Sequence, residues 1–316
     1  MTIATHPEPR ATPLTPPVVS PPARGGGRSR RFHHPSNYLF IIPAILLTGG
    51  LVYFSIGYTA YLSDFDTNGI SPNRVFVGFD NFARAATDPG LWLALRNIGY
   101  FFLLIPVQLA LGFGFAVVLS SRIRLAVVYK VIIFLPVVLA PAVMAPVFVQ
   151  MFSPGGQIDS LLHAVGLGQF SHAWLADPNT AIWVLGLIQI WSGTGFCFVL
   201  YLAGLSQIDS SVVEAARIDG AGNLRLLWSV ILPMVRQSTI TLVVLTTIGT
   251  IKIFDIPQII TQGGPANSTQ FLATYIYQQA IRNYAAGYGA ALTVLLVVAC
   301  LGFAILQLRL SRKGSQ

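Results

Sequence analysis

The sequence predicts an all-α integral membrane protein, with six transmembrane helices and a polar helix–glycine–helix loop on the cytoplasmic side. Composition is the first observation: of 316 residues, 54% are hydrophobic and only 9% are charged, whereas soluble domains carry roughly 25% charged residues. The apolar residues also gather in runs long enough to cross a bilayer, and the basic residues gather beside those runs. A soluble fold could not cover so much apolar surface with so few charges.

The predicted spans follow from length. A bilayer core of about 30 Å requires roughly 20 residues of helix. Six runs meet this requirement: Tyr38–Leu62, Asn97–Ser121, Val131–Phe152, Thr180–Leu205, Thr239–Ile260 and Ala290–Leu308. The third contains Pro136, Pro141 and Pro146. We expect it to be kinked, which membrane helices tolerate when neighbours satisfy the freed backbone groups.

The fifth span has to include two charged residues. Only the fifteen residues 237–251 separate Arg236 from Lys252, and at about 1.5 Å per residue they reach about 22 Å. That length is too short to cross the bilayer. The span therefore continues through Lys252 and Asp255.

The basic residues set the orientation. With a cytoplasmic amino terminus, fourteen of the nineteen Lys and Arg residues fall inside, and the outer loops hold only Arg74, Arg84, Arg96 and Arg282. This distribution satisfies the positive-inside rule. Both termini and the loop at residues 206–237 are predicted to be cytoplasmic. The net charge of +8 thus reflects membrane orientation and does not indicate a nucleic-acid partner.

The chain divides into three predicted regions. Residues 1–37 contain eight prolines, three consecutive glycines and five arginines, a composition that leaves no periodic apolar face and predicts a disordered cytoplasmic tail. Residues 38–310 form the transmembrane domain, including the loop at 206–237. Residues 311–316 form a second short cytoplasmic tail.

The polar loop is expected to be two short helices joined at a sharp corner. Ser211 and Glu214 fit the S-x-x-E capping box, which predicts a helix beginning at Ser211. Gly220 can adopt the left-handed conformation that stops a helix. A second helix is expected from about Asn223 to Ile231, with Pro233 ending it and starting the next span.

The loop also carries a specific pattern. Glu214-Ala215-Ala216 is followed by Gly220 and then by Val230-Ile231-Leu232-Pro233. This pattern resembles the cytoplasmic coupling loop of ABC importer permeases, in the carbohydrate branch that includes the maltose and glycerol-3-phosphate permeases. Val230 departs from it, since the family usually has Ile there. The resemblance implies contact with an ATPase through Glu214, Ala215, Ala216, Asp219, Gly220, Leu232 and Pro233.

Further motifs outside the loop are similar to the same family. The segment 77–82 contains its G-x-x-N-[YF] pattern, expected as a short helix capped at Asp80. Phe254-Asp255, within the fifth span, and the T-x-G-G-P-x-x-[ST]-T-like segment at residues 261–269, which follows that span, match further patterns of the family. The resemblance covers about residues 38–310.

The resemblance implies a set of partners in the cell inner membrane. They are a second permease subunit, expected to form a heterodimer, two ATP-binding subunits, and an extracytoplasmic solute-binding protein that delivers a carbohydrate. ATP-driven movement of the coupling loop would drive alternating access. Ala215 and Ala216 are small enough to enter a groove on the ATPase, and Glu214 would either hold the helix cap or reach a basic group there.

No catalytic set is recognisable. The phosphate-binding G-x-x-x-x-G-K-[ST] motif is absent, and neither a Ser/His/Asp set nor paired catalytic carboxylates are found. Cys197 and Cys300 both lie in apolar runs without neighbouring ligands, which indicates small hydrophobic residues and no metal site. We expect no enzyme activity and no cofactor.

Lys252, Asp255 and Trp191 are the candidate residues of a translocation path. Lys252 and Asp255 at i and i+3 are expected to share a helix face and to pair, and intramembrane charges usually face a water-filled path. Alternatively, Lys252 extends to the outer interface while Asp255 compensates it or caps the turn at Pro257. Trp191 could stack on a sugar ring or simply pack between helices.

A second function class remains open from the residues alone. An ion-driven secondary transporter would act without an ATPase. It needs coupling carboxylates within the spans, of which Asp255 is the only one, and inverted repeats, which the sequence does not show. A membrane enzyme is disfavoured by the missing catalytic set.

Overall fold

The computed structural model describes residues 41–120 and 124–313 of the chain. By internal contacts it divides into two units, residues 1–51 and residues 52–316. The first contributes helix α2 (Ile42–Thr48) and the start of the π-helical turn η1 (Gly49–Tyr53). The predicted tail at residues 1–37 lies outside the described residues.

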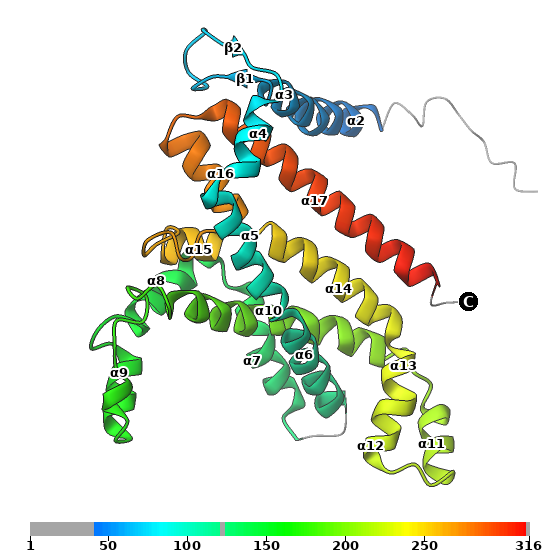
Figure 1. The fold of residues 1–316 in the computed structure, drawn as a ribbon. Coiled ribbons are helices and arrows are strands. Elements are labelled where there is room, and N and C mark those ends of the chain that lie inside the picture. The colour runs from blue at the N-terminus through cyan, green and yellow to red at the C-terminus, as the bar shows by residue number, and fades with distance from the viewer. Residues whose placement is uncertain (1–40, 121–123, 314–316) are drawn as a thin grey trace, which may run out of the picture. The chain divides into compact units, whose positions relative to one another are not determined.

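The second unit is almost entirely helical (Figure 1). Its elements are α3 (Phe54–Leu62), β1 (Phe65–Asp66), β2 (Val75–Phe76), α4 (Asp80–Thr87), α5 (Pro89–Phe102), α6 (Ile105–Ser120), α7 (Ala126–Val138), α8 (Pro141–Met151), α9 (Gln157–Ala164), η2 (Gly168–Phe170), α10 (Ala181–Leu205), α11 (Ser210–Ile218), α12 (Asn223–Leu226), η3 (Leu227–Ile231), α13 (Leu232–Met234), α14 (Arg236–Ile251), α15 (Asp255–Ile260), α16 (Leu272–Tyr277), η4 (Gln278–Arg282) and α17 (Ala286–Lys313). The two short strands pair antiparallel, Phe65 with Phe76 and Asp66 with Val75.

In the described part of the chain, five helices are long and apolar enough to cross a membrane: Ile42–Leu62, Pro89–Ser120, Ala181–Leu205, Arg236–Ile260 and Ala286–Gln307. A sixth span results if α7 and α8 together form one. The predicted all-α membrane class is therefore correct. The count of six depends on how the bent pair α7–α8 crosses.

The bend between α7 and α8 is much sharper than the predicted kink. The two helices meet at 98°, and the residues between them, Leu139 and Ala140, have extended ψ angles of 122° and 137°. Proline disfavours the helical conformation of the residue before it, so Pro141 forces Ala140 out of the helix and then begins α8. Pro136 and Pro146 remain inside their helices. One proline therefore causes the break.

Two predicted span boundaries were also wrong. The second span begins at Pro89 and not at Asn97, because a single arginine does not end a helix: Arg96 remains helical with its guanidinium 5.8 Å from the Tyr100 ring, as long basic side chains do near an interface. The last helix runs from Ala286 to Lys313. It includes residues 311–313 of the predicted tail, and residues 314–316 lie outside the described residues.

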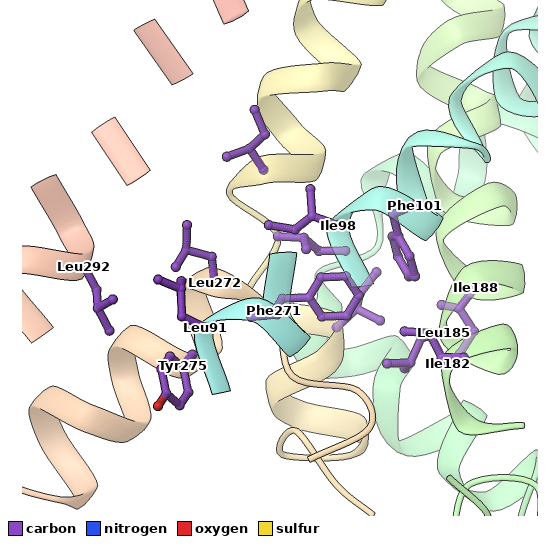
Figure 2. Close-up of a cluster of buried hydrophobic side chains, with 14 of the residues drawn as sticks. Leu91, Ile98, Phe101, Ile182, Leu185, Ile188, Phe271, Leu272, Tyr275 and Leu292 are labelled. Carbon is purple, nitrogen blue, oxygen red and sulfur yellow. The ribbon is translucent and has the colours of Figure 1, made fainter. Parts of the chain in front are cut away.

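Two apolar clusters hold the second unit together. The larger joins α5, α10, α15, α16 and α17, with Phe101 against Phe271 at its centre (Figure 2). The smaller joins α6, α10 and α14 around Cys197, Tyr201 and Leu242. Cys197 is fully buried there, as expected for a small hydrophobic residue. The described residues contain no group of His, Cys, Asp and Glu that could hold a metal ion.

Buried amides fix two connecting loops to the spans. Asn97 on α5 donates to the carbonyls of Ser268 and Gln270, each at 2.8 Å, and so fixes the loop that follows α15. Asn81 donates to the carbonyls of Ser63 and Phe65 at 2.9 and 3.1 Å. The G-x-x-N motif thus acts through its asparagine. Asp80 is not a cap, because α4 begins at Asp80 itself and has no side-chain cap.

Asp88 joins the ends of three helices. Its carboxylate caps α5 by accepting from the Gly90 amide at 2.8 Å, and it also accepts from the hydroxyls of Tyr275, at 2.6 Å, and Tyr288. Burial opposes ionisation, but these hydrogen bonds outweigh it and hold the pKa of Asp88 below its usual value. Asp88 therefore stays charged and connects α5 to α16 and α17.

Replacing Asn97 with alanine should destabilise the packing of the loop at residues 268–270 against α5. The substitution removes two hydrogen bonds and leaves two partly buried carbonyls without their donor, which costs about 1–3 kcal/mol. We expect a lower unfolding temperature for Asn97→Ala than for the wild type in detergent. Asn73→Ala, at an exposed position, is the control, and equal temperatures for the two variants would contradict the assignment.

Candidate functional site

The segment at residues 206–237, here called the elbow, consists of two helices and a glycine corner. Its first helix, α11, begins at Ser210, and Asp209 is its cap: the carboxylate accepts from the Ser211 amide at 2.9 Å. Hydrogen bonds from the Ser211 amide and hydroxyl lower the pKa of Asp209. The predicted capping box starting at Ser211 was therefore wrong, because an acidic residue two positions earlier satisfies the free amide.

Gly220 has the conformation that the sequence predicted. Its φ is +81°, in the left-handed region that favours glycine. The Ala221 amide donates to the Ala216 carbonyl and the Gly220 amide to the Arg217 carbonyl, both at 3.0 Å. These two bonds form a Schellman motif, which ends α11 and turns the chain.

The second helix of the elbow is longer than predicted. α12, η3 and α13 run on continuously from Asn223 to Met234, so Pro233 does not end the helix. The preceding turn η3 is π-helical, and such a widened turn accommodates a proline in the next turn. The break comes at Val235, with φ −89° and ψ 12°, before α14 begins.

The elbow is largely exposed in this chain. α11 contains no buried residue, and the side chains of Ile218, Leu224 and Trp228 are 86%, 75% and 65% exposed. Of the predicted coupling residues, Glu214, Ala215, Asp219, Gly220 and Pro233 are exposed and Ala216 is half-buried. Leu232 instead packs against the smaller apolar cluster and joins the elbow to the spans.

A cavity of about 320 Å³ lies where two helices break. Pro141, at the break before α8, and Lys252 and Asp255, at the break between α14 and α15, all line it, and α8 packs against α15. Irregular backbone at membrane depth is tolerated where it is buried or lines a water-filled cavity. Paired breaks of this kind mark binding sites in transporters.

The structure corrects the predicted relation between the two charges. Lys252 is the residue that ends α14, and Asp255 is the first residue of α15 after an irregular Phe254. They therefore do not share a helix face, and within the described residues no salt bridge joins them. Both nevertheless line the same cavity, which favours the path interpretation over extension of Lys252 to the interface.

Two glutamines that we did not predict complete this cavity. Gln108 on α6 is buried and donates from Nε2 to the Gln189 carbonyl at 2.6 Å. Both side chains line the cavity, and a β-carbon at Gly193 would overlap the Gln108 amide. An isolated amide in each of two apolar spans was the available signal, because polar groups at membrane depth usually face the protein interior or a cavity.

Trp191 is not among the residues that line the cavity at Lys252 and Asp255. It lines a separate, mainly apolar cavity of about 340 Å³ together with Leu111, Phe115 and Pro136. Its ring packs edge-on against Phe148 with centroids 5.3 Å apart. The structure therefore brings Lys252 and Asp255 together but does not place Trp191 with them, and Phe196 is the aromatic side chain of α10 that reaches their cavity.

Comparison with known proteins identifies the family. The model of a family described as "Binding-protein-dependent transport system inner membrane component" matches residues 108–315. The chain belongs to this family. It is thus a multi-pass inner-membrane component of a binding-protein-dependent transport system, and the predicted resemblance to ABC permeases is confirmed.

Individual relatives and structures agree with this assignment. The probable ABC transporter permease protein YurN of Bacillus subtilis is 30% identical over 283 residues, covering 88% of this chain and 97% of that protein. The diacetylchitobiose uptake permease NgcF of Streptomyces coelicolor is 32% identical over 309 residues, covering 92% and 88%. A chain of a bacterial alginate ABC transporter matches the fold with a TM-score of 0.78 at 19% identity, covering 89% and 95%.

Removing the charge of Lys252 should slow transport. Hydrogen bonds to charged groups contribute about 1.5–3 kcal/mol, so Lys252→Met should reduce uptake by the reconstituted transporter roughly ten- to hundred-fold while the complex still assembles. Lys130→Met, on α7 and not among the residues that line this cavity, is the control. Unchanged uptake in Lys252→Met would contradict the assignment of Lys252 to the translocation path.

Proposed function

We propose that this chain is the permease subunit of an ATP-driven importer for a sugar or an oligosaccharide. The observation that carries the proposal is the exposed elbow ending at a left-handed Gly220, in a chain of the binding-protein-dependent family. Relatives that include NgcF and the lactose permease protein LacF of Rhizobium radiobacter, 31% identical over 283 residues, support a carbohydrate as the solute.

The elbow requires a partner. Ile218, Leu224 and Trp228 are large apolar side chains that the elbow leaves exposed, and exposed apolar surface of this kind is typical of protein interaction sites. Two ATP-binding subunits, one for each of two permease subunits, are the partners that fit. Glu214, Ala215, Ala216, Asp219 and Gly220 would lie in the contact, with Leu232 and Pro233 at the base of the second helix.

Movement of the elbow can reach the spans through packed side chains. Leu232 packs against the same cluster as Tyr201 on α10, and Tyr201 donates to the Thr239 hydroxyl on α14 at 3.1 Å. ATP-driven closure of the partners would displace the elbow and rock α10 and α14, so that the cavity at Lys252 opens outward and inward in turn. An extracytoplasmic binding protein would deliver the solute, and a second, different permease would complete the path.

The chain itself would be non-catalytic, since its sequence has no phosphate-binding loop. Ion-driven transport without an ATPase is the weaker alternative. It assigns no role to the elbow, and Asp255 is the one carboxylate that lines the path cavity. The named relatives are ABC transporter permeases.

The proposed orientation places the elbow and both termini in the cytoplasm. A cysteine replacing Glu214, in a background with Cys197→Ala and Cys300→Ala, should not react with a membrane-impermeant thiol reagent in intact cells. It should react rapidly in inside-out vesicles from cells that lack the ATP-binding subunits, because position 214 is exposed in the chain alone. Labelling in intact cells would overturn both the orientation and the coupling role.

Replacing Gly220 with valine should uncouple ATP hydrolysis from uptake. A β-branched residue at φ +81° carries strain of about 1–3 kcal/mol, which favours a different corner. Gly222→Val is the matched control, because Gly222 has φ −66° and a β-carbon there meets no atom within 4 Å. We expect Gly220→Val to hydrolyse ATP with little sugar uptake and Gly222→Val to remain coupled; normal coupling in both would contradict the role of the corner.

A further inference from the structure

One face of α14 is exposed along its whole length. Gln237, Thr241, Leu245, Gly249 and Lys252 are exposed in the chain, at successive spacings of four, four, four and three residues, and therefore form a single stripe on the helix. Leu242, Thr247, Thr250 and Ile251 on the remaining surface are buried. We call this stripe the α14 strip.

The α14 strip lines two cavities. Leu245, Gly249 and Lys252 belong to the cavity at the helix breaks. Gln237 and Thr241 belong to a second cavity of about 390 Å³, here called the inner cavity. Its other lining residues are Leu200, Gly204, Gln207, Ile208, Met234 and Ser238. The strip therefore borders a cavity at each of its two ends.

The composition of the strip excludes a lipid-facing surface. Four of its five residues are polar, charged or glycine, and amide or ammonium side chains at membrane depth are costly unless they face protein or water. The two cavities leave space beside this face. A water-filled passage accounts for both the composition and the cavities.

We propose that the inner cavity, at the elbow end of the α14 strip, is a second solute-contact site. This inference rests on the proposed function and extends it to a site near the cytoplasmic end of the spans. The solute would pass from the cavity at Lys252, over Leu245, to Gln207, Gln237 and Thr241. Leu245, 44% exposed, is the one apolar side chain of the strip and separates the two polar sites.

The groups of the inner cavity suit an uncharged, hydroxyl-rich solute. Thr241 donates to the Gln237 carbonyl at 3.0 Å, and Gln207 uses one N–H on the Ala203 carbonyl at 3.3 Å. The Thr241 oxygen still accepts, and the two glutamine amides keep both donors and acceptors. No ionisable side chain lines this cavity among the described residues, so it provides hydrogen bonds without selecting a charge.

The inner cavity lies at both ends of the elbow. Gln207 and Ile208 precede α11, and Met234 is the last residue of α13. Gly204 on α10 closely approaches Ser238 on α14, where a β-carbon would overlap the serine hydroxyl. Displacement of the elbow therefore changes the walls of this cavity directly, which makes it suited to solute release.

Cysteine labelling of the assembled complex tests whether the α14 strip and the inner cavity face a water-filled path. In the Cys197→Ala, Cys300→Ala background, Thr241→Cys and Gln237→Cys are compared with Val243→Cys, a half-buried position on the opposite side of α14. The probe is the anionic reagent 2-sulfonatoethyl methanethiosulfonate, added from the cytoplasmic side. Only the thiolate reacts, and apolar surroundings raise a thiol pKa by a unit or more, so we expect Thr241→Cys to react at least about ten-fold faster than Val243→Cys.

The outcomes separate the alternatives. Equal, slow reaction of all three cysteines would place the strip against lipid and overturn the proposal. Fast reaction of Thr241→Cys and Gln237→Cys in the isolated chain but not in the complex would place the strip in a permease–permease interface and also overturn it. Fast reaction in both, with uptake blocked while ATP hydrolysis continues, is the expected result.

A protection experiment tests solute contact. Lactose, diacetylchitobiose and maltose are first screened for uptake by the complex. A sugar that is taken up should slow modification of Thr241→Cys several-fold when present on the cytoplasmic side, whereas a sugar that is not taken up should have no effect. Equal rates with both would overturn the contact site. Failure of the cysteine-free complex to couple uptake to added ATPase would instead refute the proposed function, whatever the labelling pattern.

Discussion

The constraint on which this structure depends is that backbone polar groups in a bilayer must be satisfied inside the protein. Long helices meet it within themselves, and α10 does so over 25 residues without a break. The interruptions at Leu139–Ala140 and at Lys252–Phe254 leave backbone groups that have to be satisfied or hydrated in another way. The two breaks lie together, because α8 packs against α15 and residues next to both breaks line one cavity. The same arrangement supplies a polar, hollow site among apolar helices.

The proposed coupling role places a different constraint on the elbow. To transmit movement, the elbow has to be rigid in itself and joined to the spans at defined points. Asp209 caps its start and the Schellman motif at Gly220 fixes its corner. Leu232 anchors its second helix to the cluster shared by α6, α10 and α14. The exposed apolar residues of the elbow remain uncovered in the isolated chain. In the proposed function, the surface that would bind a partner is thus connected to α10 and α14 through packed side chains.

Much of the site could be predicted from local patterns, and the predictions that were wrong failed for local reasons. The left-handed Gly220 was predictable because a glycine after a short polar helix is the usual stop signal. Asp209 was missed as the cap because a capping box at Ser211 fitted the same sequence. Pro233 was assigned as a helix end because the π-helical turn that accommodates it has no sequence signature. Gln108 and Gln189 were passed over because an amide in an apolar run acquires a role only from what it faces.

The sequence by itself determined that the chain is an all-α membrane protein with an elbow of the ABC permease type, because hydropathy, charge placement and a short spaced motif are all local properties. Only the tertiary structure decided that Pro141, Lys252 and Asp255 share one cavity, that Trp191 lies outside it, and that Asn97 and Asp88 join distant helices and loops. Those relations join residues far apart in the chain. They arise from which helix packs against which, and no local pattern encodes that.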